Sequence, residues 1–292
     1  MCRCMGSFFM RGIISCGMDW QLIVPAAAEE LRQADLGRAW EVRLRPGQPV
    51  TARMPEGLWR GRHILTPDEV FRAAQALCGH GLAAHQRALS QGFLPLPGGH
   101  RLGVCGVMGA DGLREITSLC VRVCRDMPGV GADVFPQLRG YHTLIVGPPG
   151  SGKTTLLRDI VRLYGLSGYQ EGVADERGEI AACREGRPLL NVGPLCDVVT
   201  GLRKSAAIPL LIRAMAPQVI ATDEIGGPGD AAALAEALRC GVTILATAHG
   251  TGLPDVRNRR GMDALVDLFQ RCVVLTGPGE TPRVIQLKEE NA

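Results

Sequence analysis

Short apolar runs alternate with amphipathic segments along the second half of the chain. HTLIVG (142–147), QVIATDE (218–224) and VTILATAHG (242–250) read as strands that end in glycine or polar side chains. KTTLLRDIVRLYG (153–165) and the alanine-rich GDAAALAEALRCG (229–241) read as helices. This alternation predicts a mostly parallel sheet with helices on its faces.

Further segments of the second half continue the pattern. GVADERG predicts a short strand ending in acids, and LRKSAAIPLLIRAMA predicts a helix in its second part. MDALVDLFQRC, VVLTG and PRVIQLK predict a final helix, strand and strand. Residues 141–292 are therefore expected to form an α/β domain.

The first half shows a different, mixed pattern. EVRLRPGQPVTAR (41–53) predicts two strands around a Pro-Gly turn, and residues 99–116 predict a hairpin around Gly-Ala-Asp-Gly. Between them, Thr66 followed by Pro67 and Glu69 predicts a helix with a capping box, which Gly79 or Gly81 can end. A smaller α+β domain is expected over residues 18–125.

Two segments are expected outside these domains. Residues 126–140 (DMPGVGADVFPQLRG) hold three glycines and two prolines, which predicts a hinge linker. Residues 1–17 have a basic start and an apolar run interrupted by Arg11. We interpret them as a mis-called start, with Met18 as the true first residue, or as disordered.

Composition argues against several classes of protein. A net charge of +3 and 4% aromatic residues give no strong signal for nucleic acid. No run reaches the length of about 20 apolar residues needed to span a bilayer, so any membrane role is expected to be peripheral. The 11 cysteines are odd in number and include no Cys-x-x-Cys pair, which favours reduced thiols over a disulfide framework or a metal site.

The segment GPPGSGKTT (147–155) matches the phosphate-binding pattern G-x-x-x-x-G-K-[ST] between a predicted strand and a predicted helix. Its nine residues, Gly147, Pro148, Pro149, Gly150, Ser151, Gly152, Lys153, Thr154 and Thr155, are expected to surround the phosphates of a nucleotide. Only three basic residues of the chain are lysines. Lys153 is expected to contact the β- and γ-phosphates and Thr154 to ligate Mg²⁺.

Acidic side chains end the strand of VIATDEI. Asp223 is expected to hold Mg²⁺ or its water shell. Glu224 beside it can orient and deprotonate a water for attack on the γ-phosphate, which points to hydrolysis.

Two further strand ends supply candidates. Glu176, after Asp175, can act near the water or the metal, or can form surface ion pairs with Arg177. His249 ends another strand and is a candidate for sensing the γ-phosphate by hydrogen bonding. Thr247 can do so less directly.

Taken together, the boxes GPPGSGKTT, VADERGEIA, VIATDEIG and ILATAHG resemble those of the ATPases that energise type II and type IV secretion. Within that group the sequence is most similar to the stage III sporulation AA family, and EVRLRPGQPV and LREITSLCVRVCRD resemble its front domain. The resemblance covers roughly residues 18–280. It differs from the wider group in the residue that follows His249.

This resemblance implies a RecA-like P-loop domain and a homo-oligomeric, usually hexameric ring, with nucleotide between domains or at subunit boundaries. It implies that front-domain arginines reach the phosphates, and Arg122 and Arg125 lie in the fitting stretch. Arg213 is a candidate for facing a neighbouring subunit. The implied partners are membrane proteins of the sporulation stage III channel complex, reached from the mother-cell cytoplasm.

The function expected from the sequence is a Mg²⁺-dependent ATPase motor that energises assembly or transport through such a complex. One alternative is a nucleic-acid-dependent ATPase of the RecA or helicase type, which DNA-stimulated turnover would reveal. Another is a scaffold that binds nucleotide without hydrolysing it, which tight binding without turnover would reveal.

Overall fold

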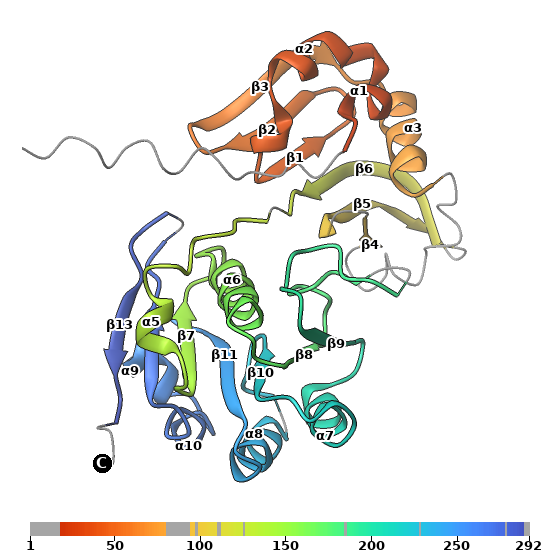
Figure 1. Ribbon diagram of the computed structural model, residues 1–292. Helices are drawn as coiled ribbons and strands as arrows, with labels where there is room; N and C mark the ends of the chain where they lie inside the picture. Colours follow the sequence, from red (N-terminus) through yellow and green to blue (C-terminus); the bar gives the residue numbers. More distant parts are fainter. Residues whose placement is uncertain are drawn as a thin grey trace, which may run out of the picture. The chain divides into compact units, whose positions relative to one another are not determined.

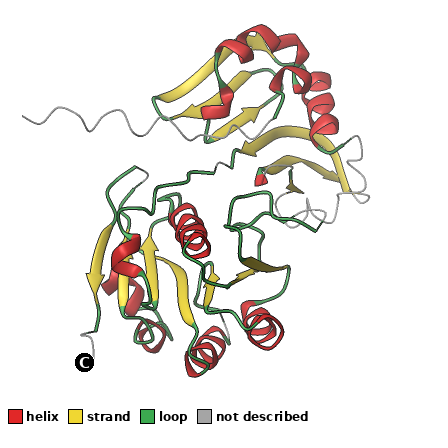
Figure 2. Cartoon of the chain, viewed as in Figure 1, coloured by secondary structure: helices red, strands yellow, loops and turns green. Residues whose placement is uncertain are grey.

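The computed structural model describes residues 18–79, 94–96, 99–109, 112–124, 126–183, 186–227, 229–277 and 279–288. The chain forms two compact units, one spanning Ile13–Arg125 and the other containing Asp126–Ala292. Arg125 lies outside the described residues. Figure 1 labels the elements of both units, and Figure 2 separates helices, strands and loops.

The front unit is built on an antiparallel sheet with the strand order β3-β2-β1-β6-β5-β4. Its strands are β1 (Glu41–Leu44), β2 (Pro49–Met54), β3 (Gly57–Ile64), β4 (Leu94–Pro95), β5 (Arg101–Gly109) and β6 (Gly112–Arg122). The two strand pairs expected from the sequence are present as β1–β2 and β5–β6, both antiparallel. The edge strand β3 was not expected.

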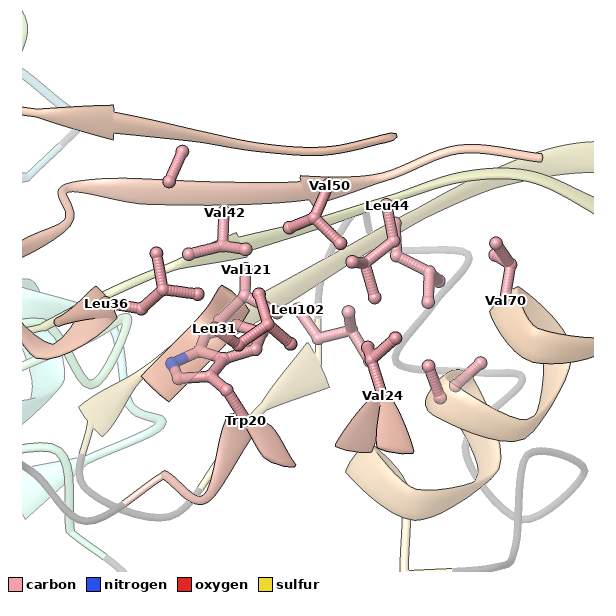
Figure 3. Close-up of a cluster of buried hydrophobic side chains, with 14 of the residues drawn as sticks. Trp20, Val24, Leu31, Leu36, Val42, Leu44, Val50, Val70, Leu102 and Val121 are labelled. Carbon is pink, nitrogen blue, oxygen red and sulfur yellow. The ribbon is translucent and has the colours of Figure 1, made fainter. Parts of the chain in front are cut away.

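Alternating apolar side chains of this sheet form the front core. Val42 and Leu44 of β1 are fully buried and pack with Leu102 and Val121 from neighbouring strands. Trp20 belongs to the same cluster (Figure 3). The helical segments of this unit are α1 (Trp20–Ile23), η2 (Pro25–Ala27), α2 (Ala28–Gln33), η3 (Leu36–Arg38) and α3 (Pro67–Leu77).

Helix α3 has the start that the sequence predicts. The Thr66 side chain accepts from the Glu69 N–H, and the Glu69 carboxylate accepts from the Thr66 N–H, which completes the capping box. Cys78 is the C-cap, and Gly79 follows with a φ of 62°. A left-handed glycine at this position is a common way to end a helix.

The opposite face of the front sheet is rich in arginine. Arg43, Arg45, Arg53 and Arg60 line a groove of about 290 Å³ together with Glu41. At the edge of the sheet, the Glu30 carboxylate of α2 accepts from the backbone N–H groups of residues 62 and 63 of β3, at 2.7 and 3.3 Å. The backbone N–H groups of residues 62 and 63 are therefore already hydrogen-bonded by this carboxylate.

The rear unit is a seven-stranded sheet with the order β13-β12-β7-β11-β10-β8-β9. Its strands are β7 (Thr143–Gly147), β8 (Glu171–Asp175), β9 (Cys196–Thr200), β10 (Val219–Thr222), β11 (Thr243–His249), β12 (Arg271–Val274) and β13 (Arg283–Gln286). Each neighbouring pair is parallel except β12–β13. The predicted mostly parallel sheet is confirmed.

Helices bury both faces of the rear sheet. They are α5 (Phe135–Leu138), α6 (Lys153–Leu166), α7 (Lys204–Met215), α8 (Asp230–Arg239), α9 (Leu253–Arg257) and α10 (Asp263–Val266). Leu144 of β7 joins a cluster with residues of α7 to α10, whereas its neighbour Ile145 joins a second cluster with residues of α5 and α6. The residues on both faces of β7 are buried, as expected for a central parallel strand.

The structure differs from the sequence-based expectation at three points of this unit. Strand β9 was not predicted. Helix α7 begins at Lys204, ahead of Pro209, and is not confined to the second part of its segment. Burial of Lys204, Ala207 and Ile208 holds this first part in place. The helix expected over residues 262–272 is the single turn α10, and Arg271 and Cys272 already belong to β12.

The segment predicted as a hinge, residues 126–140, contains α5 and bonds to α6. The Asp159 carboxylate accepts from the N–H groups of Gly129 and Gly131, at 2.9 and 2.7 Å. The Tyr164 hydroxyl donates to the Leu138 carbonyl and accepts from the Gly140 N–H. These contacts attach the segment to the rear unit, and its role as a hinge stays a prediction.

Candidate functional site

The phosphate-binding segment connects β7 to α6 at the carboxyl end of the sheet. Gly150 and Gly152 have φ values of 76° and 95°, which favour glycine. A side chain at Gly147 would meet Ser151 and would come within 2.9 Å of the Leu275 carbonyl. The three glycines are thus required by backbone conformation or by close approach, and they leave the loop compact.

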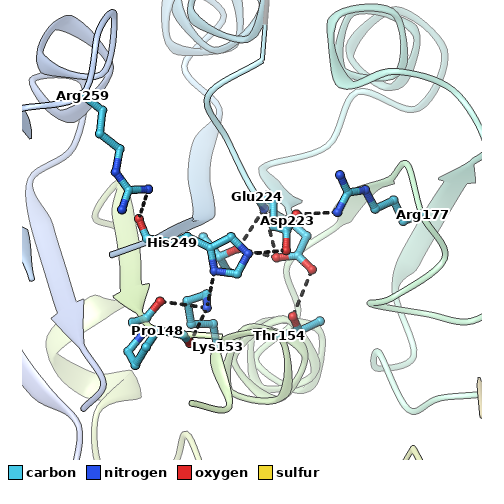
Figure 4. Close-up of polar contacts among 10 residues, drawn as sticks. Pro148, Lys153, Thr154, Arg177, Asp223, Glu224, His249 and Arg259 are labelled. Atoms are coloured by element: carbon cyan, nitrogen blue, oxygen red, sulfur yellow. Dashed lines mark hydrogen bonds and ion pairs between the residues drawn. The ribbon is translucent and has the colours of Figure 1, made fainter. Parts of the chain in front are cut away.

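The Lys153 ammonium lies inside this loop. It donates to the carbonyls of Gly147 and Pro148, both at 2.9 Å, and lies 3.1 Å from His249 Nδ1 (Figure 4). Burial lowers the pKa of Lys153, while the carboxylates of Asp223 and Glu224 act to raise it. Two carbonyls therefore hold the Lys153 ammonium at the base of the loop, and the charges of the two acids act on it from further away.

Thr154 in the first turn of α6 contacts Asp223 after β10, although the two residues are 69 positions apart in sequence. The Thr154 hydroxyl donates to Asp223 Oδ2 at 3.0 Å. Hard oxygen ligands of this kind suit Mg²⁺, which usually takes one or two protein oxygens together with phosphates and water. The Ser151 hydroxyl is buried without a hydrogen-bond partner among the described residues, so the loop has an unused polar group. The residues present fit a nucleotide phosphate with Mg²⁺.

Asp223 and Glu224 follow β10, and Thr247 of β11 contacts both. The Asp223 Oδ1 atom accepts from the Thr247 hydroxyl, and the Glu224 N–H donates to the Thr247 Oγ1 atom at 2.8 Å. Strands β10 and β11 are parallel neighbours, with Thr222 opposite Ala246. Thr247 is the next residue of β11 and so lies level with the acidic pair.

Both carboxylate oxygens of Glu224 are engaged. Oε1 lies 2.7 Å from His249 Nε2, and Oε2 accepts from Arg177 at 2.6 Å (Figure 4). The Lys153 ammonium can only donate and the carboxylate can only accept, so His249 accepts at Nδ1 and donates at Nε2. His249 therefore bridges Lys153 and Glu224 as the neutral Nε2–H tautomer.

Glu176 binds Lys204 and shows no contact with the acids that follow β10. Its carboxylate forms an ion pair with Lys204 at 3.1 Å. Burial acts to raise the pKa of Glu176, but the hydrogen bond and charge of Lys204 outweigh it and the pKa is lowered. The Asp175 carboxylate accepts from the N–H groups of residues 179, 180 and 181. Asp175 thus caps its own loop, and neither acid shows a contact with Asp223 or Glu224.

The contacts of the site described above include neither Arg122 nor Arg213. Arg122 is exposed on β6, opposite Glu41 in the register, on the arginine-rich face of the front unit. Arg125 lies outside the described residues, and Arg213 is exposed in the last turn of α7. Their roles towards phosphates or a neighbouring subunit stay predictions.

Sequence reasoning missed three contacts of the site. Arg177 was considered only in the alternative of a surface ion pair with Glu176, and the structure pairs it with Glu224. Lys204, one of three lysines, was not considered as a partner of Glu176. Arg259 donates to the His249 carbonyl at 2.8 Å. The scarcity of lysine was a signal for Lys204, whereas no local pattern marked the two arginines.

The described residues form neither a metal site nor a membrane-spanning helix. Among the described residues, no three or more His, Cys, Asp or Glu side chains gather as a metal site. The structure has free thiols at Cys78, Cys105, Cys120, Cys183, Cys196, Cys240 and Cys272. Within the same part of the chain, no helix has both the length and the apolar character to cross a bilayer.

Comparison with solved structures places the fold. The Legionella pneumophila ATPase DotB matches with a TM-score of 0.59 at 16% identity, over 86% of this chain and 76% of DotB. The pilus retraction motor PilT with bound ADP matches with a TM-score of 0.57 at 16% identity, over 88% of this chain and 78% of PilT. These similarities confirm the predicted RecA-like P-loop fold.

Sequence comparison gives the family. Stage III sporulation protein AA of Bacillus subtilis is 33% identical over 267 residues, which cover 84% of this chain and 85% of that protein. The family model described as sporulation stage III, protein AA matches residues 28–292. With its P-loop, acidic strand end and histidine assembled on this fold, the chain belongs to the sporulation stage III, protein AA family.

Proposed function

We propose that this protein is a Mg²⁺-dependent ATPase motor that works with a membrane-embedded sporulation channel complex. The observation that carries the proposal is the hydrogen bond from Thr154 to Asp223, with Glu224 next in the chain. This contact joins the phosphate-binding loop to a carboxylate suited to a metal and places a second carboxylate beside it. A site that only held nucleotide would have no need of the second acid.

The residues of the loop supply binding. The backbone N–H groups at the start of α6 and the Lys153 ammonium are the donors for the β- and γ-phosphates. Lys153 would exchange its present bonds to the Gly147 and Pro148 carbonyls for phosphate oxygens. Thr154 and Asp223 would hold Mg²⁺, which neutralises charge on the phosphates when bound.

Glu224 is the group for proton transfer. Once one of its oxygens leaves its present partner, the carboxylate can orient a water in line with the γ-phosphorus and take its proton. The new oxygen–phosphorus bond forms as the bond to the β–γ bridging oxygen breaks, which yields ADP and phosphate. Lys153 stays beside the departing charge and stabilises it.

The free energy of ATP hydrolysis would drive movement only if the hydrolytic cycle is coupled to a larger protein assembly. We infer a homo-oligomeric ring. Arg122, Arg125 or Arg213 would complete the site of the same or a neighbouring subunit. The dependence of turnover on protein concentration tests this arrangement. The partners would be membrane proteins of the sporulation channel, and the protein would act from the mother-cell cytoplasm. The fold shared with the ATPase DotB and the pilus retraction motor PilT supports a motor role.

The test is ATP turnover per subunit, measured with Mg²⁺ over a wide range of protein concentration. Wild type is compared with Glu224→Gln and with Glu236→Gln, a matched control on α8. General-base catalysis contributes about 10²–10⁴-fold, so Glu224→Gln is expected to lose at least about 10²-fold in kcat while it still binds nucleotide.

A steep rise of specific activity with concentration would support a site completed between subunits. Turnover that Glu224→Gln leaves intact would contradict the assigned base. Tight nucleotide binding without turnover, also in the presence of the membrane partners, would replace the motor by a nucleotide-dependent scaffold.

A further inference from the structure

Thr247 is a buried hydroxyl between the two acids of the site. Its side chain is fully buried on β11. The hydroxyl donates to Asp223 Oδ1, and Oγ1 accepts from the Glu224 N–H at 2.8 Å. The Thr247 carbonyl accepts from the Ile225 N–H, also at 2.8 Å. One residue of β11 thus binds three consecutive residues after β10.

Glu224 has a backbone conformation that needs such support. Its φ is 47°, in the left-handed region that residues other than glycine rarely adopt. This conformation turns the chain sharply after Asp223. The side chain of Glu224 then reaches His249, and that of Asp223 reaches Thr154. Two adjacent carboxylates can therefore serve different partners only while this turn is kept.

We propose that Thr247 is a positioning residue for Glu224, which holds the left-handed turn that aims the carboxylate for water activation. This inference rests on the proposed hydrolytic function. The side chain touches neither substrate nor metal in this role and acts through Glu224 and Asp223.

The geometry argues against phosphate sensing by Thr247. A threonine hydroxyl has a single hydrogen to donate, and here Asp223 receives it. A phosphate oxygen can only accept from such a group, so a contact with phosphate would require that bond to break. The full burial of the side chain also leaves it without an exposed surface for a ligand.

Thr247→Val and Thr247→Ser distinguish the contribution of the hydroxyl from that of the branched side-chain shape. Valine keeps the branched shape and removes the hydroxyl, whereas serine keeps the hydroxyl. Thr143→Val is the matched control, because Thr143 is also fully buried and its hydroxyl donates to the Tyr141 carbonyl at the other end of the sheet. Unfolding midpoints of all variants are measured first.

The affinity for a fluorescent ATP analogue is measured in EDTA, and kcat and KM are measured with Mg²⁺. Misplacement of a catalytic group by about 1 Å costs about 10²-fold. We expect Thr247→Val to lose about this factor in kcat, with the analogue affinity within about threefold of wild type. Thr247→Ser should recover most of kcat, and Thr143→Val should retain it.

Two kinetic results would overturn the inference. A Thr247→Val variant with wild-type kcat would show that the hydroxyl does not position the base. A loss of analogue affinity with unchanged kcat would make Thr247 a ground-state binding residue.

A crystal structure of Thr247→Val decides the point independently of activity. Glu224 should leave the left-handed region in this variant, and a retained φ near the present value of 47° would refute the inference. If wild type shows no turnover at all, also in the presence of the membrane partners, the proposed function fails. The crystal structure still tests whether Thr247 holds the turn.

Discussion

Arg177 donates to Oε2 of Glu224 at 2.6 Å and thereby joins the loop after β8 to the end of β10. His249 occupies the other oxygen of the same carboxylate. The Arg177 side chain is 62% exposed and that of His249 is 40% exposed. Arg177 is therefore the partner that can leave Glu224 more readily.

We expect Arg177→Ala to raise basal turnover, because it frees one oxygen of the base. Exposed ion pairs are worth about 0.2–1 kcal/mol, so the rise should not exceed about fivefold. The measurement is kcat at saturating ATP, with Arg239→Ala on α8 as an exposed arginine control. A fall in kcat would show that Arg177 supports the reaction.

His249→Ala and His249→Gln test the bridge between Lys153 and Glu224. Alanine removes both contacts, whereas glutamine offers a donor and an acceptor on one side chain. We expect a loss of about tenfold or more in kcat for alanine, within the range of a misplaced catalytic group, and a smaller loss for glutamine. His63→Gln in the front unit is the control, and equal losses for both His249 variants would contradict the bridging role.

Asp159 attaches the segment after residue 126 to α6. Asp159→Ala leaves the buried Gly131 N–H and the partly buried Gly129 N–H without their acceptor, and the buried donor costs about 1–3 kcal/mol. We expect the free energy of unfolding to fall by about 1–3 kcal/mol in urea denaturation, with the exposed Asp133→Ala as control.

Hydrogen exchange tests the same attachment in the native protein. The amides of Gly129 and Gly131 should be protected in wild type and should exchange faster in Asp159→Ala. Rapid exchange across the whole of 126–140 in wild type would favour a hinge that extends along the segment.

Glu171 is expected to make the free energy of unfolding depend on pH. It is 1% exposed, and neither carboxyl oxygen has a hydrogen-bond partner among the described residues. Burial raises the pKa of Glu171 to about 9, whereas an unfolded glutamate has a pKa of about 4.3. The folded protein holds the proton more tightly, so this stabilisation is complete below the unfolded pKa and is lost as the pH rises towards the folded pKa.

The slope is about 1.4 kcal/mol per pH unit between the two pKa values. Glu171→Gln cannot ionise, so its unfolding free energy relative to wild type should grow by a few kcal/mol, about 4 at most, from about pH 5 to about pH 8. Urea denaturation at both pH values measures this. Parallel pH profiles for the two proteins would show that Glu171 ionises normally.

Local patterns predicted the elements whose signals are short-range. The capping box of α3 depends on residues three positions apart, and the phosphate-binding loop is one continuous motif. Both were confirmed as structural elements. Strand β9 was missed because CDVVT is short and is only half-buried. Pro209 concealed the first part of α7, which packing of Ala207 and Ile208 stabilises.

The site depended on contacts that no spacing rule encodes. The apolar run before Asp223 and Glu224 predicted that these two acids lie at the end of a strand. The partners Arg177, Thr247 and His249 are 23 to 47 positions away from Glu224, and only the strand order β8-β10-β11 brings them together. The left-handed turn at Glu224 also has no signal in the residue type, because a glutamate gives no indication of a positive φ.

The Glu30 carboxylate at the margin of the front sheet has a consequence for aggregation. An exposed row of strand donors is a template on which another chain can add as a further strand. Because Glu30 already takes the N–H groups of residues 62 and 63, a foreign strand would have to displace a charged side chain to pair there. This part of β3 is thus protected from pairing with a strand of another molecule.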